Sequence, residues 1–215
     1  MNCPLCESHS TTAFFEKVDP IHGIRKYFKC HDCLLIFLLP EAHLSPEDEK
    51  QRYDQHQNNP DNVGYVKSLK KLVVPLSSKL RPASHGLDFG CGPQSVLKLM
   101  FEELGHSMDL YDPFYFNNEE VLRQRYDFVA CTEVVEHFYS PQKEFITLNN
   151  LLKTQGSVLG IMTQLVENEN DFRDWWYHRD PTHVCFYRRE TFQWIASWKR
   201  FTVEYPDANI VILTK

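Results

Sequence analysis

The sequence predicts an α/β fold, in which a doubly wound, mostly parallel sheet over residues 84–215 follows a small cysteine-rich module. Two observations lead to this prediction. From residue 84 onward, short apolar runs typical of strands alternate with longer segments of helical periodicity. Before residue 40, two Cys-x-x-Cys pairs enclose two further apolar runs. The 215 residues leave room for one ordinary domain and a smaller module.

The cysteine-rich module occupies residues 1–40. CPLC at 3–6 and CHDC at 30–33 are separated by 23 residues, and AFFEKV and IRKYFKC between them are expected strands. Each pair makes a tight turn that directs two thiolates to one point, so two pairs supply the four sulfurs that tetrahedral zinc prefers. The arrangement resembles a zinc ribbon, whose metal stabilises a module too small to fold on its own core. We predict one structural zinc bound by Cys3, Cys6, Cys30 and Cys33; four buried thiols or an iron site are the alternatives.

Composition narrows the classes of function. The formal net charge is −6, and residues 1–40 carry four basic and four acidic side chains, which makes RNA a possible but disfavoured partner. The N-terminus lacks the features of a signal peptide, and the longest apolar run, at 34–39, is too short to span a bilayer. We therefore expect a soluble cytoplasmic protein with reduced cysteines and no membrane partner.

Residues 41–83 are predicted to connect the module to the sheet. Their first part is polar and has no periodicity, whereas Val66, Leu69, Leu72 and Val73 follow helical spacing. We expect an irregular connector followed by one helix that packs on the next domain.

The elements of residues 84–215 follow in order from their sequence patterns. Gly105 and Gly156 each end a helical segment, and Ser140 with Pro141 begins one. The expected strands are 85–90, 107–112, 126–132, 157–163, 201–205 and 209–215, and the expected helices are 95–105, 141–156 and 189–198.

The first strand of this region ends in LDFGCGP, residues 87–93. Gly90 and Gly92 allow a sharp turn and a close approach of the backbone to a ligand, at the start of a helix. Asp88 precedes them, and Asp112 ends the next strand, where a carboxylate can accept the hydroxyls of a ribose. Ligands of doubly wound sheets bind at these carboxyl ends of the strands.

Here the chain resembles the class I S-adenosylmethionine-dependent methyltransferases, which have a Rossmann-like sheet. LDFGCGP is similar to their first motif, DLYDP to their ribose-binding acid, and YDFVACTEVVEHF to their fourth strand and the loop after it. The resemblance implies that Gly90 and Gly92 face the amino-acid part of S-adenosylmethionine, that Asp88 supports the loop or the cofactor ammonium, and that Asp112 holds the ribose. It also places Glu133 beside the cofactor loop.

Two departures from that family pattern are visible. Pro93 and Gln94 stand where the fuller motif has its third glycine. Only 13 residues separate Asp112 from Tyr126, so we expect the sheet to be shortened around its third strand. A nicotinamide dehydrogenase, the rival for this topology, requires G-x-G-x-x-G, and that spacing fails here.

Residues 164–189 form a long aromatic segment without clear periodicity. Segments of this length in a compact domain usually carry function, and large amphipathic rings suit a cover over a planar substrate. The alternative is that Trp175 and Phe186 only fill the core. Because an imidazole titrates near neutrality, we predict three candidate catalytic bases. They are His137, His178 and His183.

TEVVEHF, residues 132–138, places three ionisable groups after a strand. On a helical turn, Glu133, Glu136 and His137 would converge at i, i+3 and i+4, and His183 could complete a site for magnesium or another divalent cation. The run resembles the small-RNA 2′-O-methyltransferases, in which it binds magnesium, and is also similar to quinone-type O-methyltransferases. Alternatively, Glu133 only braces the cofactor loop and His137 only caps a helix.

The sequence as a whole predicts an S-adenosylmethionine-dependent methyltransferase that modifies an oxygen, or a nitrogen or carbon, of a small molecule. The acidic net charge favours a phenolic or sugar acceptor over RNA. Two alternatives stay open: a metal-assisted RNA 2′-O-methyltransferase, and a non-catalytic zinc-ribbon adaptor with a degenerate methyltransferase fold.

Overall fold

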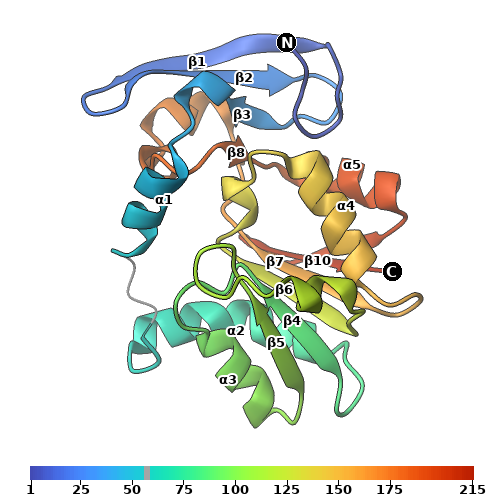
Figure 1. Cartoon of the computed structure of the whole chain (residues 1–215). Coiled ribbons are helices and arrows are strands. Elements are labelled where there is room, and N and C mark those ends of the chain that lie inside the picture. The colour runs from blue at the N-terminus through green and yellow to red at the C-terminus, as the bar shows by residue number, and fades with distance from the viewer. Residues whose placement is uncertain (56–58) are drawn as a thin grey trace.

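A six-stranded sheet forms the centre of the larger part of the molecule, in the order β5-β4-β6-β7-β10-β9 (Figure 1). The computed structural model describes residues 1–55 and 59–215. The strands are β4 (His85–Phe89), β5 (Ser107–Tyr111), β6 (Phe128–Thr132), β7 (Val158–Met162), β9 (Thr202–Asp207) and β10 (Ile210–Thr214). The first four in spatial order are parallel, and β10 and β9 are added antiparallel. The predicted doubly wound sheet is confirmed.

Helices cover both faces of this sheet (Figure 1). On β6, Phe128 and Ala130 face the core under α2 and α3, while Val129 and Cys131 face the core under α4 and α5, because successive strand residues point to opposite faces. Within the described residues, no helix has the length and apolar character needed to cross a lipid bilayer. The covering helices are α2 (Val63–Ser77), α3 (Val96–Glu103), α4 (Pro141–Leu151) and α5 (Arg189–Lys199).

The sheet ends at β5, as the short spacing between Asp112 and Tyr126 predicts. Residues 113–125 are all described, and their only regular element is the 3-10 helix η2 (Glu119–Arg123). Tyr126 anchors the return of the chain, because its hydroxyl donates to Val121 O at 2.8 Å. The shortened connection brings the chain from β5 back to β6 without a third strand.

The N-terminal module forms a second sheet, in the order β1-β2-β3-β8. The two predicted strands are present, but the sequence did not predict that the fourth strand would come from the aromatic segment near the C-terminus. Ile36 pairs with Phe186 and Phe37 with Cys185, which joins the module directly to that segment. Buried residues of the module and of the α4/α5 face form one continuous core. The strands are β1 (Thr11–Asp19), β2 (Gly23–Cys30), β3 (Ile36–Leu38) and β8 (Cys185–Phe186).

Helix α1 (Pro46–Tyr53) lies where the sequence predicted an irregular connector, so that prediction was wrong. PEDEKQRY has no apolar stripe, but Ser45 Oγ accepts from the Asp48 N–H at 3.2 Å, and Pro46 and three acids occupy the first turn. The 3-10 turn η1 (Pro40–Ala42) precedes α1. α1 lies between the module and the six-stranded sheet (Figure 1). Residues 56–58 of the predicted connector lie outside the described part of the chain.

Candidate active site

The four cysteines of the module converge as their spacing predicts. The Sγ atoms of Cys3, Cys6, Cys30 and Cys33 lie within 4.8 Å of one another, with Cys3–Cys33 and Cys6–Cys30 each at 3.5 Å. Four sulfurs around a tetrahedral zinc, each about 2.3 Å from the metal, are separated by roughly 3.8 Å. The four side chains therefore fit a zinc ion.

The glycine loop begins where β4 ends. Gly90 has a φ of 80° and Gly92 a φ of 63°, a left-handed conformation that glycine adopts without strain. The Gly90 N–H donates to Tyr111 O at 2.8 Å, and the Gly92 N–H donates to Asp112 Oδ2 at 2.9 Å. The ends of β4 and β5 are thus tied together, and α3 begins directly behind the loop.

Asp88 is 2% exposed at the end of β4. Ser95 Oγ donates to its Oδ2 at 2.6 Å, whereas its Oδ1 is buried without a hydrogen-bond partner among the described residues. Burial raises the pKa of Asp88 to about 7. An orphaned carboxylate oxygen beside a glycine loop fits the ammonium group of S-adenosylmethionine.

Asp112 joins three backbone N–H groups. Besides the Gly92 contact, its Oδ1 accepts from Phe114 N–H at 2.9 Å and from Tyr115 N–H at 3.2 Å. The side chain is 7% exposed and lines the same cavity as the glycine loop. An ionised carboxylate has about four acceptor positions, so Asp112 keeps acceptor capacity for ribose hydroxyls.

A cavity of about 700 Å³ opens at the carboxyl ends of β4, β5, β6 and β7. The glycine loop, the residues that follow β6 and the aromatic segment all contribute to its lining. Helix α1 contributes Glu49, Arg52 and Tyr53 to the lining, and the aromatic segment contributes Trp176 and Tyr177. The predicted cofactor residues and the predicted substrate segment therefore face one space.

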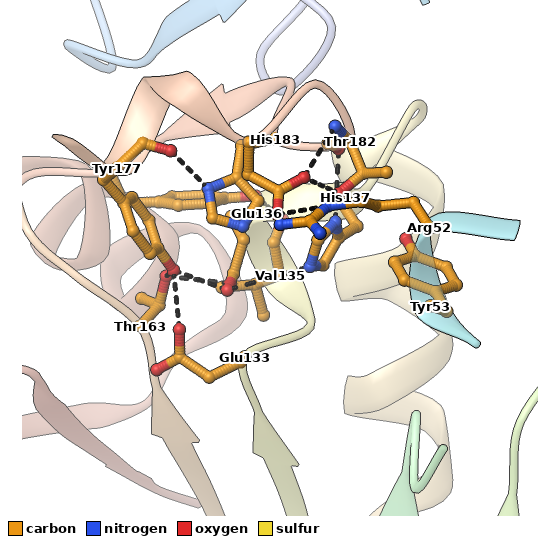
Figure 2. A network of polar contacts seen from close by, with 12 residues as sticks. Arg52, Tyr53, Glu133, Val135, Glu136, His137, Thr163, Tyr177, Thr182 and His183 are labelled. Atoms are coloured by element: carbon orange, nitrogen blue, oxygen red, sulfur yellow. Dashed lines mark hydrogen bonds and ion pairs between the residues drawn. The ribbon is translucent and has the colours of Figure 1, made fainter. Parts of the chain in front are cut away.

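Two carboxylates meet the Tyr177 hydroxyl at the end of β6 (Figure 2). This hydroxyl lies 2.5 Å from Glu136 Oε1 and 3.1 Å from Glu133 Oε2. Thr163 Oγ1 donates to Glu136 Oε2 at 2.9 Å. The Tyr177 hydroxyl has only one proton, so it can donate to only one of the two carboxylates. The contact with the other carboxylate requires a proton on a carboxyl group or a bound cation. Burial and the nearby Glu133 carboxylate raise the pKa of Glu136 well above its usual range.

Two histidines lie beside these carboxylates. The Nδ1 of His137 is 3.1 Å from Thr182 O, and the Nδ1 of His183 is 2.7 Å from Tyr177 O. A carbonyl oxygen only accepts, so each Nδ1 carries the proton and each Nε2 has the lone pair in the neutral ring. The ring centroids are 4.8 Å apart. This geometry suits a general base or a metal ligand. We call Glu133, Glu136, His137 and His183 the acid–histidine cluster.

The local backbone differs from the predicted helical turn. The 3-10 turn η3 (Val135–His137) begins only at Val135, and Glu133 has a left-handed φ of 54°. Potential ligand atoms of Glu136, His137 and His183 lie within 4.8 Å of one another, a group that does not include Glu133. Glu133 is linked to Glu136 by the Tyr177 hydroxyl that both carboxylates contact.

His178, the third predicted base, is not brought into this group. It stacks on Phe172, and its Nδ1 and Nε2 lie 3.1 Å from Lys17 Nζ and 3.2 Å from Arg173 O. Burial, followed by the Lys17 charge, lowers the pKa of His178. It does not line the cavity, so the structure does not place it to act on a substrate there.

Some residues of the site could not be found by sequence reasoning. Thr163, Glu49 and Arg52 carry no functional pattern in the sequence, and Tyr177 is one of many rings in the aromatic segment. The SPEDE run at 45–49, a typical helix start, was the available signal for α1. Thr163 offered no signal beyond its place after a strand.

A model described as a methyltransferase domain matches residues 55–203, which is well over half of the chain. The chain belongs to this methyltransferase domain family. The match includes the glycine loop, Asp112 and the acid–histidine cluster. It confirms the prediction of a class I S-adenosylmethionine-dependent methyltransferase fold.

Relatives of this methyltransferase-family chain are distant. A ubiquinone biosynthesis O-methyltransferase of Vibrio atlanticus is 34% identical over 73 residues, which cover 34% of this chain and only 31% of that protein. A candidate sarcosine dimethylglycine methyltransferase of Galdieria sulphuraria has a similar structure, with a TM-score of 0.52 at 16% identity over 76% of this chain and 69% of the other. A candidate methyltransferase of Bacillus halodurans gives 0.50 at 16% identity, over 64% and 67%. These two structures support the fold.

Proposed function

We propose that this protein is an enzyme that transfers a methyl group from S-adenosylmethionine to a small-molecule acceptor, with oxygen as the favoured acceptor atom and nitrogen or carbon as alternatives. The observation that carries the proposal is the shared cavity of about 700 Å³, which is lined both by the glycine loop and by Glu133, His137 and His183 of the acid–histidine cluster. Its size falls in the range of roughly 300–1,000 Å³ typical of small-molecule sites.

The cofactor end of the cavity follows from the first two strands. Gly90 and Gly92 let the backbone approach the amino-acid part of the cofactor, Asp88 Oδ1 accepts from its ammonium, and Asp112 accepts from the ribose hydroxyls. Glu133, which follows β6 and lines the cavity, is the member of the cluster that would lie nearest the cofactor. When bound, S-adenosylmethionine supplies a methyl group on a positively charged sulfur, which an acceptor atom displaces.

The acceptor end is formed by the cluster and the aromatic segment. In each neutral imidazole, the Nε2 of His137 or His183 can take the proton that an acceptor hydroxyl releases. Trp176 is 59% exposed and lines the cavity, so it can cover a planar acceptor. The chain thus aligns the acceptor and receives its proton, which is most of what methyl transfer requires of a protein.

The charges around the cavity favour a small acceptor over a nucleic acid. Six acidic side chains line it against two basic ones, and such a lining repels phosphates. The Vibrio relative is a ubiquinone biosynthesis O-methyltransferase, which supports oxygen as the acceptor atom. The acidic residues are Glu49, Asp88, Asp112, Glu133, Glu144 and Asp180, and the basic ones are Arg52 and Lys143.

A second candidate function is metal-assisted methylation, in which Glu136, His137 and His183, with Glu133 nearby, bind magnesium or another divalent cation. The grouping of their ligand atoms within 4.8 Å supports it. Two carboxyl oxygens and two imidazoles form a ligand set that suits several divalent metals. RNA 2′-O-methylation would be one reaction of this metal-assisted kind.

We further propose that residues 1–40 form a zinc ribbon, that residues 41–83 connect it, and that residues 84–215 form the methyltransferase domain. The zinc, held by Cys3, Cys6, Cys30 and Cys33, would be structural, because four sulfurs leave no open coordination position.

The test supplies radiolabelled S-adenosylmethionine and purified protein to a cell extract split into RNA and small-molecule fractions. We expect label in the small-molecule fraction, and loss of that label with Asp112→Asn. Label confined to RNA would support the second candidate. Saturable cofactor binding without transfer in either fraction would instead support a non-catalytic adaptor.

A further inference from the structure

Arg25 is a buried arginine in the N-terminal module. It lies on β2 and is 1% exposed. Its Nη2 donates to Pro181 O at 2.9 Å and its Nε to the Tyr27 hydroxyl at 3.3 Å, while Nη1 has no hydrogen-bond partner among the described residues. None of the ion pairs of residues 1–55 and 59–215 includes Arg25. Burying a guanidinium without a carboxylate costs free energy, so fold stability alone does not explain this side chain.

The carbonyl that Arg25 contacts belongs to a tight turn, residues 180–183. Asp180 Oδ1 accepts from the Thr182 N–H at 3.1 Å and from Thr182 Oγ1 at 2.6 Å, and the His183 N–H donates to Asp180 O at 3.2 Å. On the side of α1, Arg52 donates to Asp180 Oδ2 through Nε at 3.0 Å and Nη2 at 2.7 Å. Two arginines from outside the six-stranded sheet therefore hold this turn.

The same turn positions the acid–histidine cluster. Thr182 O accepts from His137 Nδ1, and His183 is the last residue of the turn (Figure 2). The next residue, Val184, donates its N–H to Glu136 O at 2.9 Å. On its other side, Val184 O accepts from the Leu38 N–H of the module at 2.8 Å. Both imidazoles thus depend on the 180–183 turn, which the module contacts at Pro181 and, one residue after the turn, at Val184.

We propose that Arg25 is a positioning residue of the active site, which acts through Pro181 O to hold the 180–183 turn and, with it, His183 and the partner carbonyl of His137. The module is then a structural part of the active site as well as a metal-binding unit. This inference rests on the proposed function in one respect only, namely that the acid–histidine cluster takes part in methyl transfer.

Arg25→Met tests the proposal, because methionine fills a similar length of space but removes the donor. Hydrogen exchange of the purified zinc-bound protein measures the turn directly and needs no substrate. We expect faster exchange of the amides of His183 and Val184, with unchanged exchange in the glycine loop. Removing the buried guanidinium relieves its desolvation cost but leaves Pro181 O without this donor, and these effects oppose each other, so the unfolding midpoint should change little.

The kinetic measurement separates positioning from stability. With an acceptor in hand, kcat of Arg25→Met should fall by about tenfold or more, because small displacements of catalytic groups are costly. The KM for S-adenosylmethionine should not change, since the described residues show no hydrogen bond between the 180–183 turn and the glycine loop. Arg25→Lys, which keeps one cationic donor, should restore part of kcat and of the exchange protection. If the Met variant fails to fold, the Lys variant provides both measurements.

Lys26→Met is the matched control. Lys26 is adjacent on β2, but its side chain is exposed and pairs with Glu16 at 3.5 Å. It should leave both readouts unchanged. Uniformly faster exchange with a lower unfolding midpoint in Arg25→Met, or unchanged exchange at 183–184, would overturn the proposal. If the wild type transfers no methyl group, the proposed function fails, while the exchange result still decides whether Arg25 holds the turn.

Discussion

The hydroxyl of Tyr177 and the carboxylate of Glu136 lie 2.5 Å apart inside the core, where Glu136 is 0% exposed. A charge at this depth is costly, which raises the pKa of Glu136 and favours its neutral form. The pair joins the end of β6 to the aromatic segment, which are 41 residues apart in sequence. It therefore ties the aromatic segment, whose Tyr177 lines the cavity, to the turn that follows β6.

The two histidines of the cluster should be needed for turnover. We expect His183→Gln and His137→Gln each to lower kcat by about 100-fold or more, the usual contribution of a general base, with little change in cofactor affinity. His178→Gln is the matched control, because its ring contacts Lys17 and Arg173 outside the cavity. Equal losses in all three variants would contradict the assignment. Steady-state kinetics at fixed acceptor concentration provides the comparison.

Asp88 should make the cofactor-free protein less stable as pH rises. Its pKa is raised from 3.8 to about 7, so the folded state keeps a proton that the unfolded state has lost. The free energy of unfolding therefore falls between about pH 4 and pH 7. Asp88→Asn removes this fall and should raise stability at pH 8, by at most roughly 4 kcal/mol for a shift of about three units.

The same substitution should weaken cofactor binding, because the carboxylate that meets the ammonium is lost. Urea unfolding at pH 5 and pH 8 measures the first effect, and calorimetry with S-adenosylhomocysteine measures the second. Asp171→Asn, at an exposed carboxylate, is the control for a simple change of net charge. Wild-type affinity for S-adenosylhomocysteine in Asp88→Asn would show that Asp88 does not contact the cofactor.

Much of the fold was predictable because its signals are local. The strands of residues 84–215 are short apolar runs, and the starts of α3 and α4 follow Ser95 and Ser140 as expected. The predicted end of the second helix at Gly156 was wrong, because α4 ends at Leu151. The missing third strand followed from a simple count of residues. The cysteine spacing predicted a four-sulfur site for a similar reason. Each Cys-x-x-Cys pair is a local pattern, and only the approach of one pair to the other depends on the fold.

The rest depended on contacts between segments far apart in the chain. The pairing of Phe37 with Cys185 carries no local signal, because a two-residue strand is too short for a pattern. α1 lacks an apolar stripe, so periodicity could not reveal it. His178 and His183 were equivalent candidates in sequence, and only the path of the aromatic segment turns one toward the module and the other toward the cavity.

Asp112→Asn should weaken binding of S-adenosylhomocysteine by on the order of 10- to 100-fold, the usual effect of losing hydrogen bonds to a charged group. The carboxylate accepts from the N–H groups of Gly92, Phe114 and Tyr115, and an amide has one acceptor oxygen instead of two. Titration calorimetry tests this, with the exposed Glu119→Gln as control. Unchanged affinity would show that the ribose lies elsewhere.

Each chain should hold one zinc, and its loss should affect more than the module. We expect Cys30→Ser to lower the zinc content of protein purified without added metal. Because β3 pairs with β8, hydrogen exchange should then accelerate at 185–187 as well as in residues 1–40. The exposed His31→Gln, adjacent to Cys30, should retain the zinc. Full metal content in Cys30→Ser would refute the four-sulfur site.

Glu136→Gln distinguishes the two candidate chemistries. In the favoured proposal Glu136 only holds Tyr177 and Thr163 by hydrogen bonds, and burial raises its pKa toward the neutral form, so a neutral amide of the same shape should keep kcat within a few-fold of wild type. Turnover should also withstand a chelator dose that leaves the zinc content unchanged. Metal-assisted transfer requires the ionised carboxylate as a ligand, and would instead give a large loss of kcat, chelator sensitivity and recovery of the wild type with added magnesium. That pattern would make the acid–histidine cluster a divalent-cation site.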